Sequence, residues 1–161
     1  MRLHLGCGDK RWPGFVNIDR NDDPIMGEPD LKTDIRKMDL PDNHAEEIHA
    51  IHLFEHLPRM EADRVLNEWR RVLKPDGKLV IEIPCLDKIA QNIVNGEKNM
   101  RLTVLGLFGD PMDKKPDMLH QWCYSKHEIQ TMLEGVGFRS VDIAEPKFHM
   151  AQRDMRVEAI K

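Results

Sequence analysis

Three features are missing from this sequence of 161 residues, and each absence excludes a class of protein. The 3 cysteines, Cys7, Cys85 and Cys123, are far apart and odd in number, so they predict neither a disulfide framework nor a Cys-x-x-Cys metal site. No apolar run is long enough to span a bilayer. There is also no excess of positive charge, because the formal net charge is −4, and a weakly acidic chain is poorly suited to coat a nucleic-acid backbone.

The length and composition indicate one globular domain. A chain of this size suits a single domain over residues 1–161, and 40% hydrophobic residues are enough for a buried core. The N-terminal sequence MRLHLGCGDK enters a strand-like run without a signal-peptide pattern. We therefore expect a reduced, soluble, cytoplasmic protein with no membrane or nucleic-acid partner, and we make no prediction of its oligomeric state.

Strand-like and helix-like patterns alternate along the chain. Short apolar or β-branched runs predict strands, and amphipathic stretches between them predict helices. This alternation predicts an α/β domain with a mostly parallel sheet. The expected strands cover residues 2–5, 14–19, 30–35, 46–54, 77–84, 139–145 and 154–161, and the expected helices cover 58–77, 87–96 and 125–138.

The segment 87–124 is the least regular part of the sequence. A helical stretch, DKIAQNIVNG, is followed by the loop-like sequence FGDPMDKKPDM. Long irregular stretches in compact domains often form lids or binding loops. We therefore expect this variable segment to select the substrate.

A glycine turn and two acidic residues point to a nucleoside site. The sequence LHLGCG places two glycines directly after the first strand, where the backbone can turn sharply and approach a ligand. Asp19 ends the second expected strand, and a carboxylate there can bind the two hydroxyls of a ribose. Asp34 lies near the end of the third, within reach of an adenine amino group. The alternative is that both aspartates are solvated loop residues.

The glycine turn lacks the third glycine of the Gly-x-Gly-x-x-Gly pattern. The next residues, DKRWPGF, are too few for a full helix between the first two strands. A bound pyrophosphate normally needs the N-terminus of that helix. The sequence therefore argues against NAD and favours a nucleoside without phosphates.

Several ordered blocks resemble one family of enzymes. The blocks LHLGCGDKRWPGFVNID, FEHL, EWRRVLKPDGKLVIEIP and YSKHEIQTMLEGVGF are similar to those of class I S-adenosylmethionine-dependent methyltransferases, above all the small bacterial branch of methyltransferase type 11. The resemblance implies a Rossmann-like, seven-stranded, mostly parallel sheet with an antiparallel last strand, here with a shortened first helix. It also implies S-adenosylmethionine as cofactor and S-adenosylhomocysteine as product.

The resemblance assigns roles to particular residues. One position departs from the family pattern, because His4 stands where the family often has an acid, and Lys10, Arg11 or Trp12 then become candidates to cover the site. The resemblance implies that Gly6, Cys7 and Gly8 line the methionine part of the cofactor, that Asp19 holds the ribose hydroxyls, that Asp34 and Ile35 contact the adenine, and that Leu53 and Phe54 flank the sulfonium.

Two histidines are the candidate catalytic residues. A sulfonium methyl is already activated, so the enzyme must mainly align the acceptor and exclude water. A hydroxyl acceptor benefits from a general base, and histidine is the usual one. His120, in MLHQWCYS beside Trp122 and Tyr124, is the first candidate, and His56 is the second. Both residues also have structural interpretations, as a loop contact for His120 and as a turn-stabilising hydrogen bond for His56.

The sequence HLFEH at residues 52–56 also fits the His-x-x-Glu-His pattern of zinc peptidases. That function needs one helix that carries both histidines, and Pro58 disfavours helical backbone at Leu57. No convincing third ligand is evident in the sequence, so we expect no metal site. Three functions therefore remain in order of preference: a methyltransferase for a small-molecule or sugar-containing acceptor, a cofactor-binding protein without catalysis, and a zinc hydrolase.

Overall fold

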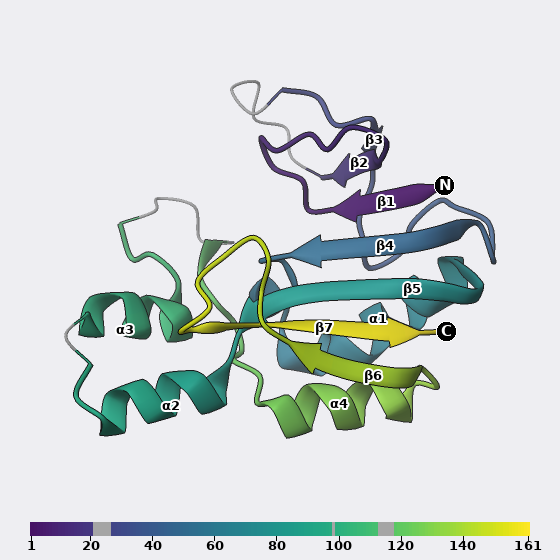
Figure 1. Cartoon of the computed structure of the whole chain (residues 1–161). Helices are drawn as coiled ribbons and strands as arrows, with labels where there is room; N and C mark the ends of the chain where they lie inside the picture. Colours follow the sequence, from purple (N-terminus) through teal and green to yellow (C-terminus); the bar gives the residue numbers. More distant parts are fainter. Residues whose placement is uncertain (21–26, 98, 113–117) are drawn as a thin grey trace.

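A seven-stranded sheet forms the centre of the molecule (Figure 1). The computed structural model describes residues 1–20, 27–97, 99–112 and 118–161. The strand order is β3-β2-β1-β4-β5-β7-β6, with β7 antiparallel to both of its neighbours and the other pairs parallel. The strands are β1 (Arg2–Leu5), β2 (Val16–Asp19), β3 (Leu31–Lys32), β4 (Ala45–Ile51), β5 (Leu73–Pro84), β6 (Arg139–Ala144) and β7 (Asp154–Ile160).

Four α-helices and two 3-10 turns accompany the sheet in the described residues. They are η2 (Phe54–His56), η3 (Arg59–Glu61), α1 (Ala62–Val72), α2 (Leu86–Val94), α3 (Met100–Phe108) and α4 (Lys126–Gly135). Helix α1 begins at Ala62, later than predicted, because Pro58 has an extended backbone and residues 59–61 form the 3-10 turn η3 first. Helix α3 was not predicted, since its sequence MRLTVLGLF has no polar face.

The predicted fold class is confirmed. The sheet is mostly parallel, its last strand is antiparallel, and no helix separates β1 from β2. Several strands are shorter than predicted: the strand expected at 30–35 is limited to Leu31–Lys32, the strand expected at 46–54 ends at Ile51, and the strand expected at 14–19 begins only at Val16. No helix in the described part of the chain is both long enough and apolar enough to cross a bilayer.

The two faces of the sheet differ in character. Cross-strand partners lie on the same face, and one face carries Leu3, Ile48, Leu79 and Ala159 in adjacent positions. All four are buried in the main hydrophobic core. Helices α1 and α4 cover this apolar face and contribute Trp69, Leu66 and Ile129 among other buried residues.

The opposite face is polar, and no helix of the described residues covers it. His4, Asn17 and His49 lie on it in adjacent positions, as do Lys78, Glu82, Arg156 and Glu158 farther along the sheet. The buried side chain of Arg156 lies 2.8 Å from Glu82 and 2.6 Å from Glu158, and Lys78 Nζ lies 2.5 Å from Glu158. Ion pairs therefore satisfy this face in place of a helical layer.

Three aromatic side chains cover part of the polar face. Trp12 stacks on His4 with ring centroids 4.1 Å apart, and contacts Phe15 and Phe148 at 5.3 and 4.7 Å. Because the turn between β1 and β2 is too short for a helix, its Trp12 covers the sheet where that helix would otherwise pack.

The carboxyl ends of the parallel strands meet at one edge. Helices α2 and α3 lie beyond this edge, on the side to which the arrows of β1, β2 and β4 point (Figure 1). Ligands of open α/β sheets bind outside this edge. A ligand site is therefore expected near the glycine turn, the turn after β4 and the described residues of the variable segment 87–124.

Candidate functional site

The glycine turn has the backbone that the sequence predicts. Gly6 and Gly8 have φ values of +62° and +51°, in the left-handed region that glycine tolerates best. A Cβ atom on Gly6 would meet Leu53 Cδ1 at 2.5 Å, whereas a Cβ on Gly8 would meet no atom within 4 Å. Cys7 between them is buried and its amide donates to the Ile18 carbonyl, 3.1 Å away. The turn is therefore closed by Leu53 on one side and open at Gly8.

Asp19 lies directly beside this turn. Its Oδ2 accepts a 2.8 Å hydrogen bond from the Gly8 amide. Arg11 extends over the same turn and donates to the carbonyl of Gly8, to Cys7 Sγ at 3.1 Å and to the Gly27 carbonyl at 2.9 Å. Of the three residues expected to cover the site, Arg11 is the one on the glycine turn, whereas Trp12 covers the polar sheet face.

His4 does not take part in this turn. It is buried on the polar face, where it stacks under Trp12 and contacts Asn17 Oδ1 at 3.3 Å. The residue that departs from the family pattern is therefore used for packing.

The predicted adenine contacts lie near the end of β3. Asp34 forms a bidentate ion pair with Arg36. Its Oδ2 lies 2.6 Å from Nη2, and its Oδ1 lies 2.9 Å from Nε. The hydrogen bond from Arg36 lowers the pKa of the Asp34 carboxyl. Ile35 is buried and its carbonyl accepts a hydrogen bond from the Trp69 indole. The adenine contacts of both residues stay predictions.

Leu53 and Phe54 have different surroundings. Leu53 is half-buried against Gly6. Phe54 is fully buried and packs against Tyr124 and Trp69, with ring centroids 5.0 and 5.6 Å away. Leu53 is thus the member of the pair beside the glycine turn. Tyr124, expected as a wall for the acceptor, belongs to the core with Phe54, while Trp122 is exposed and donates to Glu128.

A sharp turn after β4 positions the next residues. His52 has φ of +49°, which is uncommon for a residue other than glycine and often marks a functional site. Its amide donates to the Glu82 carbonyl at 2.8 Å. After it, Phe54–His56 form the single 3-10 turn η2. No continuous helix carries residues 52–56, so the zinc-peptidase interpretation of HLFEH is excluded by the backbone.

Two polar contacts connect the end of the variable segment to η2, one from each side. The Gln121 amide donates to the Glu55 carbonyl at 2.7 Å, and His56 Nδ1 lies 3.2 Å from the Leu119 carbonyl. Leu119 also pairs with Gly109 at the end of α3. These contacts hold His120 against η2, so the structure brings together the two candidate catalytic histidines, whose ring centroids are 4.9 Å apart.

The ring nitrogens of the two histidines have defined roles. His120 Nδ1 lies 2.9 Å from the Gly106 carbonyl, and His56 Nδ1 faces the Leu119 carbonyl. A carbonyl oxygen only accepts, so each Nδ1 must carry the proton, and in a neutral ring Nε2 then has a free lone pair. Burial lowers the pKa of His120, although the Glu55 carboxylate partly offsets this effect. His120 is therefore a neutral acceptor at pH 7.

Glu55 is the site residue that the sequence did not reveal. Its side chain is 0% exposed, and within the described chain neither carboxylate oxygen has a hydrogen-bond partner. His52 Nδ1 lies 2.7 Å from Oε1, without the alignment of a hydrogen bond. Burial by itself would lower the pKa of His52, but the charges of Glu55 and Asp154 raise it to about 9. Only the three-dimensional packing makes this carboxylate unusual.

A second cluster lies on the other side of His52. His52 Nε2 is 3.4 Å from Asp154 Oδ2, and the His52 ring lies against His149 in a tilted arrangement, with ring centroids 3.9 Å apart and 52° between the ring planes. Glu82 fixes the loop before β7 by accepting hydrogen bonds from the amides of Lys147 and Phe148. Nothing in the sequence pattern links His149 to the site, because its position depends on this loop.

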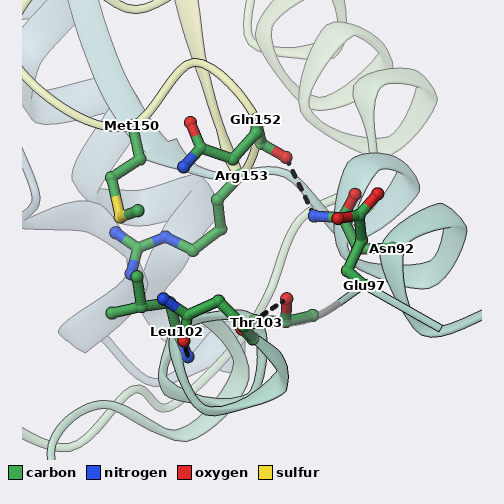
Figure 2. A pocket seen from close by; sticks show the side chains of 8 residues that line it. Asn92, Glu97, Leu102, Thr103, Met150, Gln152 and Arg153 are labelled. Atoms are coloured by element: carbon green, nitrogen blue, oxygen red, sulfur yellow. Dashed lines mark hydrogen bonds between the residues drawn. The ribbon is translucent and has the colours of Figure 1, made fainter.

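A small cavity of about 140 Å³ lies away from the glycine turn, between α2, α3 and the loop before β7 (Figure 2). Asn92 on α2 donates to the Gln152 carbonyl at 3.0 Å across its edge. None of the predicted site residues is among those that line it, which are Asn92, Glu97, Asn99, Leu102, Thr103, Met150, Gln152 and Arg153.

The residues at the glycine turn fit S-adenosylmethionine. The open side of Gly8 lets a ligand approach the backbone closely, and the Asp19 carboxylate lies at the end of β2, where a ribose is bound in related folds. When bound, this cofactor supplies a methyl group on a sulfonium. The residues that would bind this cofactor lie at the edge formed by β1, β2 and the turn after β4.

Comparisons with known proteins agree with this arrangement. Residues 12–81 match the family model described as a methyltransferase domain. An S-adenosylmethionine-dependent methyltransferase from Archaeoglobus fulgidus aligns over 99% of this chain and 85% of its own, with 18% identity and a TM-score of 0.68. One from Methanosarcina mazei aligns over 99% and 91%, with 17% identity and a TM-score of 0.66. No curated protein matches the sequence.

A third solved structure has a similar fold and is described with a more specific activity. The protein from Thermotoga maritima, described as a possible histamine N-methyltransferase, aligns over 99% of this chain and 81% of its own, with 13% identity and a TM-score of 0.69. Residues 12–81 therefore match a methyltransferase domain, the chain has the fold of solved S-adenosylmethionine-dependent methyltransferases, and S-adenosylmethionine is the cofactor that this likeness implies.

Proposed function

We propose that this protein transfers a methyl group from S-adenosylmethionine to a hydroxyl group of a small-molecule or sugar-containing acceptor. The observation that carries the proposal is the meeting of His56 and His120 beside Leu53, which itself contacts Gly6 of the glycine turn. A hydroxyl is a poor nucleophile until it loses its proton, whereas many amine acceptors need no base. Two histidines with free Nε2 lone pairs therefore favour an oxygen acceptor.

Each part of the chain has a separate task in this function. The glycine turn and Asp19 bind the cofactor, and Leu53 closes the turn on the side of η2. Residues 119–122 contact η2 and would limit the access of water to it. His120 and His56 orient the acceptor hydroxyl and accept its proton as the new bond forms. Alignment of the acceptor with the sulfonium supplies the remaining rate enhancement.

A methyl-transfer screen tests the proposal directly. Purified protein and S-adenosylmethionine with a labelled methyl group are incubated with panels of hydroxyl, amine and carboxylate acceptors. We expect label in hydroxyl compounds only, and we expect His120→Ala to reduce the rate by about 100-fold or more, the scale of a lost general base. The matched control is His127→Ala, since His127 is exposed on α4 and is not one of the site residues.

Two outcomes would contradict the proposal. Label found in amines rather than hydroxyls would show that the acceptor class is wrong. Binding of S-adenosylhomocysteine without transfer to any acceptor in a broad panel would favour a cofactor-binding protein that does not catalyse methyl transfer. Calorimetry with S-adenosylhomocysteine, run on the same preparation, separates this second result from a failure to bind the cofactor.

A further inference from the structure

We propose that Glu55, His56 and His120 bind a divalent transition-metal ion, which holds the acceptor hydroxyl during methyl transfer. The inference rests on the proposed function for its chemical role, but the metal site itself is argued from the geometry alone. It reverses the expectation from the sequence that the protein has no metal site.

The three side chains offer suitable ligand atoms close together. One carboxylate oxygen and one ring nitrogen from each histidine all lie within 4.8 Å of one another. Ligands at about 2.0–2.1 Å around a tetrahedral ion are about 3.3 Å apart, so small side-chain rotations close the site. Two imidazoles and one carboxylate suit zinc, iron and cobalt, and they leave positions open for a substrate oxygen.

The state of Glu55 is an independent indication of a missing partner. A fully buried carboxylate without hydrogen-bond donors is costly, because burial removes its hydration without replacement. Oε1 forms an ion pair with His52 Nδ1 at 2.7 Å, whereas Oε2 has no hydrogen-bond partner among the described residues. A metal ion at this position would give Oε2 the partner that it lacks.

The histidines already have the outer contacts that metal ligands use. A metal-binding histidine normally donates its other ring N–H to a carbonyl or carboxylate, which fixes the ring. His120 Nδ1 faces the Gly106 carbonyl and His56 Nδ1 faces the Leu119 carbonyl. Each ring therefore keeps Nε2 as a possible ligand atom.

The neighbouring cluster of His52, His149 and Asp154 is a weaker candidate. Its atoms also lie close enough for a metal. However, Arg153 lies 2.6 Å from Asp154 Oδ1 and donates from a second nitrogen to Oδ2 at 3.0 Å. The Met150 amide donates to the same carboxylate. Asp154 thus already has its counter-charge and its hydrogen bonds, whereas Glu55 lacks hydrogen-bond donors.

An ion in this position gives the reaction a defined acceptor class. A bound metal lowers the pKa of a hydroxyl on it, as it does for water, and a vicinal diol or catechol can occupy two open positions at once. The acceptor oxygen then forms the new bond to the methyl carbon, the carbon–sulfur bond breaks with its electron pair left on sulfur, and the hydroxyl proton passes to solvent. With the ion bound, both histidines hold the ion, and the ion takes over the activation of the hydroxyl that the proposed function assigns to the histidines as bases.

Cobalt provides a direct probe of the site. Protein without an affinity tag is stripped with a chelator and titrated with Co²⁺, with visible absorption to detect histidine-bound cobalt and Zn²⁺ added as competitor. We expect one ion per chain that Zn²⁺ displaces. Glu55→Gln and His120→Ala should each weaken Co²⁺ binding by at least about 100-fold, since even outer-contact changes cost about 10–100-fold.

Matched variants distinguish the alternatives. His127→Ala should bind Co²⁺ as the wild type does, because His127 is exposed on α4. Circular dichroism melting confirms that each variant is folded, and the nearly isosteric Glu55→Gln keeps the test valid if His120→Ala unfolds. Loss of the ion in His149→Ala with retention in Glu55→Gln would place it in the other cluster and overturn the proposal.

The readouts separate failure of this site from failure of the proposed function. Binding of S-adenosylhomocysteine is measured by calorimetry on both the stripped and the metal-loaded protein. Cofactor binding and methyl transfer that persist without any bound ion would overturn the metal proposal and leave the proposed function intact. We expect instead that stripped protein binds the cofactor but transfers methyl groups at least tenfold more slowly, and that added Zn²⁺ or Co²⁺ restores the rate.

Discussion

Asp19 illustrates what a single side chain does at the edge of this sheet. Its position as the last residue of β2 brings its carboxylate to the Gly8 amide, 11 residues earlier in the chain. The same carboxylate is the predicted partner of the ribose hydroxyls. The Asp19 carboxylate can therefore stabilise the glycine turn through the Gly8 amide and also bind the ribose of the cofactor.

The first prediction concerns this residue. Asp19→Ala should weaken S-adenosylhomocysteine binding by about 1–3 kcal/mol, the scale of hydrogen bonds lost from a charged group. Isothermal titration calorimetry measures the change, with Asp9→Ala as the control because Asp9 is exposed and pairs only loosely with Lys10 at 3.3 Å. An affinity of Asp19→Ala equal to that of the wild type would show that Asp19 does not hold the ribose.

At the scale of elements, helix α4 shows a sequence signal that the structure uses in part. Ser125 and Glu128 have capping-box spacing, and Ser125 Oγ accepts the Glu128 amide at 3.1 Å. The Glu128 carboxylate, however, accepts from Arg59 at 2.9 Å and from the Trp122 indole at 3.1 Å. Ser125 therefore caps the helix as expected, while the Glu128 side chain connects α4 to Arg59 of η3 and to Trp122 near the end of the variable segment.

The second prediction follows from this cap. Ser125→Ala should lower the free energy of unfolding by about 1 kcal/mol, because the Glu128 amide loses its acceptor. Ser125→Asp should retain most of the stability, since aspartate also caps helices well. Urea unfolding followed by circular dichroism compares the three proteins. Equal losses in both variants would mean that the Ser125 hydroxyl stabilises the helix in some way other than capping.

At the scale of the whole molecule, the sheet is unusual in having one apolar and one polar face. Helices α1 and α4 bury the apolar face, whereas the opposite face is held by charged pairs around Arg156. Burial by itself would raise the pKa of the Glu158 carboxyl, but hydrogen bonds from Lys78 and Arg156 outweigh it and lower the pKa to about 2.

The third prediction gives the pH dependence of this face. A carboxyl with a lowered pKa stabilises the folded state fully above its unfolded pKa of about 4.5, and the stabilisation is lost as the pH falls from there toward 2. Glu158→Gln should therefore cost about 1–2 kcal/mol at pH 7, after allowance for partial solvent screening. Urea unfolding should show the gap to the wild type shrinking between about pH 4.5 and pH 3, within the range of about 2–4.5 that the two pKa values define.

A control variant makes this pH test specific. Glu134→Gln removes a carboxylate on α4 that is exposed and hydrogen-bonded to the neutral side chain of Gln130. Its unfolding free energy should stay within about 0.5 kcal/mol of the wild type at every pH. If the gap for Glu158→Gln is the same at pH 3 as at pH 7, the Glu158 charge does not stabilise the folded state.

Local patterns were sufficient to predict the order of the elements. The β5 sequence GKLVIEIP is apolar or β-branched at most positions, and the glycines of LHLGCG end β1 at the residue expected. Boundaries were less accurate where tertiary pairing decides them. Leu73 joins β5 because it pairs with Ala45, and β3 has only two residues because its pairing with β2 is limited to Ile18 and Asp19 in the described part of the chain.

The sequence by itself determined the α/β order, the glycine turn with Asp19 and the two candidate histidines, because each depends on neighbours along the chain. Only the tertiary structure decided that Glu55 is fully buried without a hydrogen-bond donor, and that His120 reaches His56 across 63 intervening residues. The physical reason is that burial and long-range hydrogen bonds depend on which elements pack together. The HLFEH sequence alone contains no information about the carbonyls of Gly106 and Leu119 that orient the two rings.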